Sequence, residues 1–229
     1  MSTPMNIEQA RFNMIEQQIR PWEVLDAGVL QLLAVVKRED FCPAAMRALA
    51  FVDMEIPLQA DTEAAVRLGQ VMLAPKVEAR ILQALAVQKT DRVLEIGTGS
   101  GYMAALLAHR GQHVTTVEID AGLATQARHN LQRAGVHNVE VLQADGAKPL
   151  AANALFDVIV LSGAVAEVPA ALLAHLQPGG RLAAIVGQEP VMRATFVTRN
   201  SDAGFHTEQP WDTVAPKLQG FAEPSRFSF

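Results

Sequence analysis

Residues 93–102 constrain the fold most, because they read as a strand, a glycine-rich turn and the beginning of a helix. The segment is Val-Leu-Glu-Ile-Gly-Thr-Gly-Ser-Gly-Tyr. Glycines let the backbone turn sharply and approach a ligand with no Cβ in the way. The helix that follows presents free N–H groups to the same ligand. The segment therefore predicts a ligand-binding turn of an α/β fold.

The chain on both sides of this turn alternates between strands and helices. We predict strands at residues 92–96, 113–118, 139–143, 156–161 and 181–186, with helices at 102–109, 121–134 and 169–176 between them. This alternation is typical of a parallel sheet covered on both faces. After Gln188, two β-like segments at 194–199 and 213–218 have no helix between them. We therefore predict a Rossmann-like, mostly parallel seven-stranded sheet with an antiparallel C-terminal edge.

The first third of the chain reads as helical. Phe12, Ile15 and Ile19 recur at spacings of three and four, which predicts one amphipathic helix that stops before Pro21. Residues 51–70 lose this periodicity and are predicted to be mainly loop. Further helices are predicted at 24–36, 43–50 and 77–86. This region forms an N-terminal helical extension of the sheet.

Charge and cysteine content exclude several classes of protein. The 19 basic and 24 acidic residues give a net charge of −5, which offers no general attraction to nucleic acid or to anionic lipid. Cys42 is the only cysteine, so an internal disulfide is excluded, and its apolar neighbours predict a buried, inert thiol. The N-terminus lacks a signal-peptide pattern, and no apolar run reaches the ~20 residues of a membrane span. We expect a cytoplasmic protein.

Details of the turn narrow the kind of nucleotide that it can bind. A dinucleotide fingerprint needs Gly or Ala at its third position, so that helix and strand pack closely around a pyrophosphate. Counted from Gly97, that position is the bulky Tyr102, which disfavours NAD and FAD. The turn does not continue into Gly-Lys-Ser/Thr, which excludes a P-loop. The sequence predicts a nucleoside ligand without phosphates.

Three acids lie close to this turn. Glu118 ends the second strand, 21 positions after Gly97 (118 − 97), where a carboxylate can accept both ribose hydroxyls. Asp145 follows the third strand, at a position for accepting the amine of an adenine. Glu95 lies inside the first strand among apolar residues, where a carboxylate needs partners. Glu95 is interpreted either as a satisfied structural group or as an acceptor near the ammonium group of the ligand.

At these residues the chain resembles class I S-adenosylmethionine-dependent methyltransferases, and more specifically the protein-L-isoaspartate O-methyltransferases. The likeness covers nearly the whole chain. The segments that carry it are 13–19, Gly69-Gln70, 92–102, 117–120, Asp145-Gly146, 156–161, 167–169 and 176–182. The segments 13–19, 69–70 and 167–169 are more specific to the isoaspartate family than the cofactor motifs are.

The resemblance implies two parts: a helical extension with a substrate loop at residues 1–86, and a Rossmann-like methyltransferase domain at 87–229. It implies S-adenosylmethionine as cofactor, bound by Glu95, Gly97, Thr98, Gly99, Ser100, Gly101, Tyr102, Glu118, Ile119, Asp145 and Gly146. It also implies methylation of a carboxylate on a damaged protein, which is a protein-repair activity. The expected partner is a protein or peptide substrate, and no metal is expected.

The substrate loop departs from the family pattern. Such loops usually run Gly-Gln, then Thr-Ile-Ser, whereas this chain has Gln70, Val71, Met72 and Leu73 after Gly69. Neither replacement, Val71 for Thr or Leu73 for Ser, donates a side-chain hydrogen bond. Ser162 stands where the family commonly has Thr, so that hydroxyl is kept. A different methyl acceptor and a non-catalytic S-adenosylmethionine-binding role are therefore open alternatives. The aromatic tail with Phe221, Phe227 and Phe229 is expected to dock on the domain or on a partner.

Overall fold

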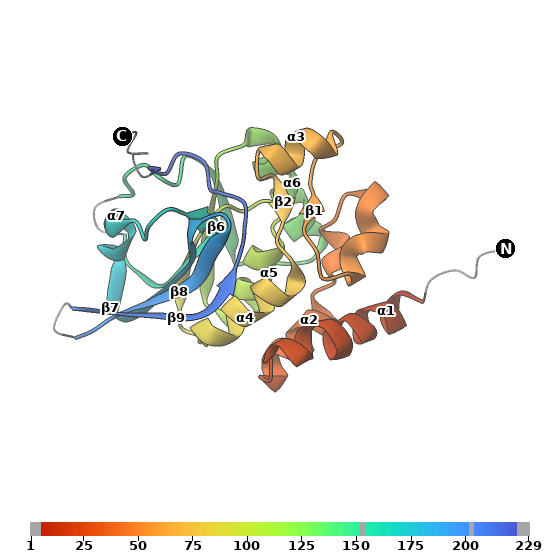
Figure 1. The fold of residues 1–229 in the computed structure, drawn as a ribbon, viewed down its shortest axis with the longest axis horizontal. Helices are drawn as coiled ribbons and strands as arrows, with labels where there is room; N and C mark the ends of the chain where they lie inside the picture. The colour runs from red at the N-terminus through yellow and green to blue at the C-terminus, as the bar shows by residue number, and fades with distance from the viewer. Residues whose placement is uncertain (1–5, 152–153, 202–203, 224–229) are drawn as a thin grey trace.

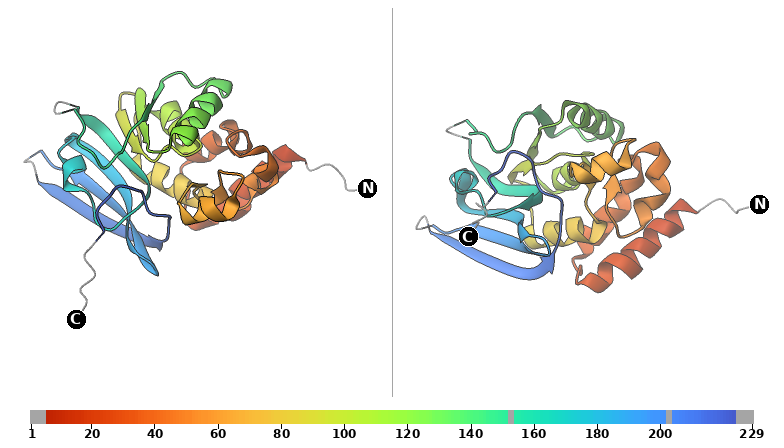
Figure 2. Two further views of the ribbon diagram at one scale, coloured as in Figure 1. Left: turned by 90° about the horizontal axis from the view of Figure 1, so that it is seen from above. Right: turned by 45° about the horizontal axis from the view of Figure 1, so that its top comes forward.

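The computed structural model describes residues 6–151, 154–201 and 204–223. Its main feature is a seven-stranded sheet with the strand order β5-β4-β3-β6-β7-β8-β9. The first five of these strands pair in parallel, and β8 and β9 add an antiparallel edge. The N-terminal helices lie at one side of the molecule and the C-terminal strands at the other (Figures 1 and 2). The predicted sheet architecture is confirmed.

The strand bounds agree with the sequence best in the parallel half. Three strands have the predicted bounds: β3 (Arg92–Ile96), β4 (His113–Glu118) and β5 (Val139–Gln143). The later strands are longer: β6 (Phe156–Val165), β7 (Leu176–Gln188) and β8 (Val191–Arg199). The predicted helix at 169–176 is only α7 (Ala170–Leu173), because Leu176 already begins β7.

The prediction of a strand at 213–218 is wrong. The last strand, β9, spans Phe205–Thr213 and is mostly exposed, so it lacks the apolar alternation that would reveal it. Residues 214–218 instead cross the end of β6, with one parallel bridge between Ala164 and Lys217. Pro216 has no N–H to give to a ladder, which suits such a short crossing. We call residues 214–220 the C-terminal strap.

The two faces of the sheet have different coverings. Val93, Val114 and Val158 pack into the larger core cluster together with α4 (Pro75–Leu85), α5 (Tyr102–Arg110) and α6 (Ala121–Arg133). Leu94 and Ile159, which point to the opposite face, pack into the second cluster with Leu172 of α7. Leu218 of the strap and Phe221 pack against this second cluster, whereas Phe227 and Phe229 lie outside the described residues. Helices thus cover both faces, as α/β sheets require.

The N-terminal region differs from its prediction in detail. The first helix is α1 (Ile7–Asn13), followed by a π-helical stretch (Met14–Ile19) and a 3₁₀ turn (Arg20–Trp22). The wider π turn changes which residues share a face, so Ile15 and Ile19 are buried while Phe12 is 58% exposed. The expectation that Phe12 belongs to the buried stripe is wrong.

The next elements are α2 (Ala27–Val35), two 3₁₀ segments (Arg38–Asp40 and Ala44–Phe51), β1 (Ile56–Pro57), α3 (Thr62–Arg67) and β2 (Val71–Met72). The segment predicted as loop therefore contains β1 and α3. The helix α3 is capped by Asp61, which accepts a hydrogen bond from the Ala64 N–H at 3.0 Å. Cys42 is buried in this layer, where loss of solvation raises the pKa of its thiol to about 11. None of the helices in the described part of the chain is long and apolar enough to cross a membrane.

Candidate functional site

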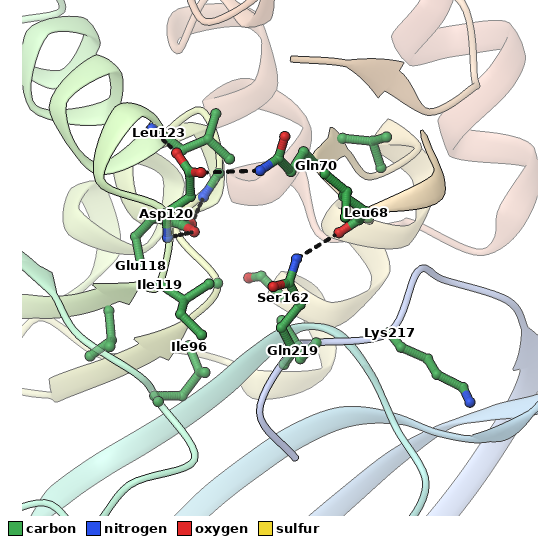
Figure 3. Close-up of a pocket in the computed structure, with 17 residues that line it drawn as sticks. Leu68, Gln70, Ile96, Glu118, Ile119, Asp120, Leu123, Ser162, Lys217 and Gln219 are labelled. Carbon is green, nitrogen blue, oxygen red and sulfur yellow. Dashed lines mark hydrogen bonds between the residues drawn. The ribbon is translucent and has the colours of Figure 1, made fainter. Parts of the chain in front are cut away.

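A pocket lies at the carboxyl ends of β3 and β4, where the glycine turn meets α5 (Figure 3). Its empty space is about 600 Å³ when the open solvent at its mouth is included. The floor comes from the glycine turn, from Glu118 to Asp120 and from Gly146. Residues 68–71 and the C-terminal strap form the other walls. Together with Ser162 of β6, residues from six separate stretches of chain therefore meet at this edge of the sheet.

The glycine turn has the backbone that its sequence predicts. Gly97, Gly99 and Gly101 have φ values of +92°, +52° and +86°, a region that other residues rarely adopt. A Cβ built on Gly97 would lie 2.7 Å from Cδ2 of Leu218, so a larger residue there would displace the Leu218 side chain as well as strain the backbone. The N–H of Gly99 points to Glu118 and donates to Oε2 at 2.8 Å. The turn is therefore rigid and closely packed.

Glu118 is the predicted ribose acceptor, and it lines the pocket with only 6% of its surface exposed. Its two oxygens accept hydrogen bonds from the backbone N–H groups of Gly99 and of Asp120, the second at 3.0 Å. A carboxylate offers about four lone-pair sites, so two are left for hydroxyl donors. Glu118 is thus held in a fixed orientation with acceptor capacity to spare.

Glu95 is completely buried and lines a second, smaller cavity. Its oxygens accept hydrogen bonds from the hydroxyls of Thr116 and Ser162, each at 2.7 Å. The pKa of this carboxyl is raised to about 8, chiefly by burial and also by the negative charges of Glu78 and Glu118, against the lowering effect of the two hydroxyl donors. The small cavity shares Val71, Gly97, Gly99 and Ser162 with the main pocket, so the two spaces adjoin.

Two hydrogen bonds tie the walls of the main pocket together. The amide of Gln70 donates to Oδ2 of Asp120 at 3.3 Å, and the amide of Gln219 donates to the carbonyl of Leu68 at 3.0 Å (Figure 3). The strap is itself fixed to β6, because the Ala164 N–H donates to Pro216 and the Leu218 N–H donates to Ala164. The start of the substrate loop and the strap therefore close over the pocket from opposite sides.

The substrate loop packs inward. Val71, Met72 and Leu73 are buried and line the small cavity, and β2 pairs with β1 in antiparallel fashion. The Arg38 guanidinium holds this loop from below, since it donates to the Leu73 carbonyl at 2.9 Å and to the carboxylate of Glu78 at 2.7 Å. The hydroxyl of Ser162 donates its hydrogen bond to Glu95, so it is not available to a methyl acceptor. Neither Val71, Leu73 nor Ser162 therefore offers a hydroxyl donor to a methyl acceptor.

The structure places most of the predicted site residues together, and a few elsewhere. The main pocket or the small cavity is lined by Glu95, Gly97, Thr98, Gly99, Ser100, Glu118, Ile119, Gly146 and Ser162, and by Gln70 to Leu73. Gly101, Tyr102 and Asp145 line neither space. Tyr102 packs edge-on against Phe41 with ring centroids 5.5 Å apart, which directs its ring toward the N-terminal layer. Asp145 accepts from the Ala147 N–H at 3.0 Å and is covered by Gly220.

Several lining residues were not among the predicted site residues, although Gly69, Ile96, Val117 and Asp120 lie in segments that carry the family resemblance. They are Leu68, Gly69, Ile96, Val117, Asp120, Leu123, Lys217, Leu218, Gln219 and, in the small cavity, Glu78 and Met103. Asp120 carries a local signal, because it precedes a helix and caps it by accepting from the Leu123 N–H at 2.8 Å. The strap carries no such local signal, since its position depends on contacts with β6, which lies about fifty residues earlier in the sequence.

Comparison with known proteins gives one consistent family. The model of the family Protein-L-isoaspartate(D-aspartate) O-methyltransferase matches residues 9–214. The chain is 39% identical over 208 residues to a protein-L-isoaspartate O-methyltransferase of Rhodopseudomonas palustris, covering 90% of this chain and 92% of that protein. A protein of the same name from Koribacter versatilis is also 39% identical, over 82% of this chain and 81% of that one.

Solved structures agree on the fold. A protein-L-isoaspartate O-methyltransferase matches with a TM-score of 0.76 at 22% identity, covering 93% of this chain and 66% of that longer one. A Plasmodium falciparum structure described as a putative member, in complex with S-adenosyl-L-homocysteine, matches with a TM-score of 0.73 at 16% identity, covering 94% of this chain and 99% of that one. The family match and the identities above decide membership: this chain belongs to the protein-L-isoaspartate(D-aspartate) O-methyltransferase family of S-adenosylmethionine-dependent methyltransferases.

Proposed function

We propose that this chain transfers a methyl group from S-adenosylmethionine to the carboxylate of an isoaspartyl residue in a damaged protein, as a step of protein repair. The observation that carries the proposal is the pocket itself: in a chain of this family, Glu118 and a tight glycine turn frame a pocket at the carboxyl edge of the sheet. The predicted cytoplasmic location is part of the same proposal.

The chemistry of the lining fits an adenosyl group. Glu118 has free acceptor capacity for ribose hydroxyls, and Ile119 and Leu123 provide apolar surface for a base. Lys217 is the only cation among the described residues that line the pocket, and its amine donates to Glu223 at 2.8 Å, away from the pocket centre (Figure 3). Phosphates would find no cation in the glycine turn, whereas the acid in the small cavity suits a positively charged amino-acid end.

S-adenosylmethionine supplies an electrophilic methyl group on a sulfonium. A carboxylate acceptor has an ordinary pKa of about 4, so it is ionised near pH 7 and needs no general base. The protein's task is to hold acceptor and donor in line, an effect worth about 7–11 kcal/mol in well-oriented systems. Gln70 and Gln219 tie the walls over the pocket, and Val71 and Leu73 keep water from the small cavity.

The acceptor must be held without a hydroxyl from the loop. A hydrogen bond to a charged group contributes about 1.5–3 kcal/mol, so the absence of one donor lowers carboxylate methylation by about one to two orders of magnitude relative to a loop with serine. Backbone N–H groups at residues 71–73 are the remaining donors of the loop. This enzyme is therefore expected to act on isoaspartyl peptides at a reduced rate.

Mass spectrometry of an isoaspartyl peptide incubated with enzyme and S-adenosylmethionine tests the proposal. We expect one added methyl group on the isoaspartyl peptide and none on the same peptide with ordinary aspartate. Glu118→Ala should abolish both cofactor binding and methylation, while Glu140→Ala, on the exposed face of β5, should preserve both. Cofactor binding without methylation of the peptide would reject the acceptor and favour another acceptor or a non-catalytic role.

A further inference from the structure

A chain of hydroxyl groups runs across neighbouring strands into Glu95. The register places Thr116 on β4 directly beside Glu95 on β3, and the Thr116 hydroxyl donates to Oε2 of Glu95 at 2.7 Å. A hydroxyl has one hydrogen, so Thr116 must accept in its contact with the Thr98 hydroxyl, 2.6 Å away. The hydrogen bonds therefore run in one direction, from Thr98 through Thr116 to Glu95.

This arrangement fixes both oxygens of Glu95. Ser162, from β6 on the other side of β3, donates to Oε1 at 2.7 Å. Thr116 is completely buried and lines neither the main pocket nor the small cavity. Its hydroxyl therefore does not touch a ligand, yet it determines how the carboxylate of Glu95 is turned and favours its ionised form, because a donor to a carboxylate stabilises the charge.

The small cavity is suited to a positive charge supplied by a ligand. Glu78 and Glu95 both line it, and none of the described residues that line it is Lys, Arg or His. Glu78 is paired with Arg38, whereas none of the ion pairs in the described stretches of chain includes Glu95. A buried carboxylate without a cation is costly. The cavity adjoins the main pocket through Gly97 and Gly99, from where a ligand can extend its cationic end.

We propose that Thr116 is a positioning residue for cofactor binding, which orients the Glu95 carboxylate toward the ammonium group of S-adenosylmethionine through the hydrogen bonds Thr98 to Thr116 to Glu95. The proposal rests on the proposed function, since it takes the cofactor's adenosyl group to occupy the main pocket and its amino-acid end to occupy the small cavity. Thr116 acts only through Glu95, so its removal affects the amino-acid end and not the adenosyl end.

Calorimetry with two probe ligands that differ only in the amino-acid end measures the effect on each end of the cofactor separately. S-adenosylhomocysteine carries the ammonium group, and methylthioadenosine is the same thioether nucleoside without the amino-acid part. For Thr116→Val, which keeps the branched shape, we expect binding of S-adenosylhomocysteine to weaken about 10- to 100-fold, the range for losing a hydrogen bond to a charged group. Binding of methylthioadenosine, measured directly or by competition, should change less than about twofold. Thr116→Ser should restore wild-type binding, because it restores the hydroxyl.

Thr115→Val is the matched control. Thr115 neighbours Thr116 on the same strand but points to the opposite face of the sheet. The Thr115→Val protein should therefore bind both probes as the wild type does. Ser162→Ala removes the second donor to Glu95 from a partly exposed site, and it should show the same selective loss even if Thr116→Val does not fold.

Three results would overturn the inference. Equal weakening of both probes in Thr116→Val would show a general structural role, and unchanged binding of S-adenosylhomocysteine would show that the hydroxyl is dispensable. Equal weakening of both probes in Ser162→Ala would likewise show a general structural role for the donors to Glu95. A wild-type protein that binds neither probe would refute the proposed function instead, and this inference with it.

Discussion

Replacing Glu95 with glutamine should stabilise the protein without ligand and weaken cofactor binding. The substitution keeps the shape of the side chain and removes its charge. Glu95 is completely buried, and the pKa of its carboxyl is raised from 4.5 to about 8, mainly by burial and in smaller part by the neighbouring acids Glu78 and Glu118. A folded protein with such a group holds its proton more tightly than the unfolded chain does. Ionising Glu95 in the folded state therefore costs stability.

The sign and size of the effect follow from these pKa values. The stability contributed by protonated Glu95 is fully present below about pH 4.5 and is lost as the pH rises through about 8. At about 1.4 kcal/mol per pH unit, the complete loss is at most about 5 kcal/mol. The glutamine side chain of Glu95→Gln cannot ionise, so the free energy of unfolding of the variant should exceed that of the wild type by an amount that grows between pH 5 and pH 9.

Urea denaturation of both proteins at pH 5, 7 and 9, without ligand, measures this difference. Glu78, whose pKa burial raises to about 7, titrates in both proteins and largely cancels in the comparison. Calorimetry should show at least about tenfold weaker binding of S-adenosylhomocysteine to Glu95→Gln. A difference in unfolding free energy that stays constant from pH 5 to pH 9, or a variant less stable than the wild type at pH 9, would refute the electrostatic reasoning.

Three further substitutions test other parts of the site. Leu73→Ser should raise kcat/KM for an isoaspartyl peptide about tenfold or more, because it adds a hydroxyl donor to the loop; an unchanged rate would show that backbone donors suffice. Gly97→Ala should weaken cofactor binding strongly in calorimetry, since its Cβ would lie 2.7 Å from the Leu218 side chain of the strap. Gly135 also has a positive φ but no atom within 4 Å of a built Cβ, so Gly135→Ala should lower the thermal stability and leave cofactor binding unchanged. Arg38→Met should destabilise the fold by about 3–5 kcal/mol above pH 7 by leaving Glu78 unpaired, and adding Glu78→Gln should recover much of that loss in urea denaturation.

The sequence predicts three strands of the parallel core to the residue, because each is a short β-like run between clear turn or helix signals. The strands β3, β4 and β5 are short runs that contain β-branched residues, each bounded by a turn or helix. The strand β9 is mostly exposed, and α3 has only six residues, so neither has a periodic apolar pattern to reveal it. Prediction therefore fails where an element has no clear local pattern and not simply where it is exposed, since β5 is predicted correctly although only Val141 of it is buried.

The same reasoning explains which parts of the site were foreseen. Gly97, Gly99 and Glu118 lie on one strand-turn-helix unit and on the strand that follows it, so local sequence places them. The hydrogen bond between Ser162 and Glu95 depends on the pairing of β3 with β6, which are far apart in the chain. The contribution of Leu218 and Gln219 depends in turn on the strap crossing the end of β6. Neither relation has a pattern in the sequence alone.

The buried carboxylate of Glu95 connects the stability of this fold with its chemistry. Two hydroxyl donors hold it in place, but no cation of the described residues pairs with it, so the protein without ligand carries the cost of its burial. A cationic ligand group removes part of that cost, so the same group that destabilises the empty site strengthens binding. The positive charge of a bound sulfonium also attracts an anionic acceptor. An apolar loop at Val71 and Leu73 can thus serve carboxylate chemistry, because the attraction for the acceptor comes from the bound sulfonium and not from the loop.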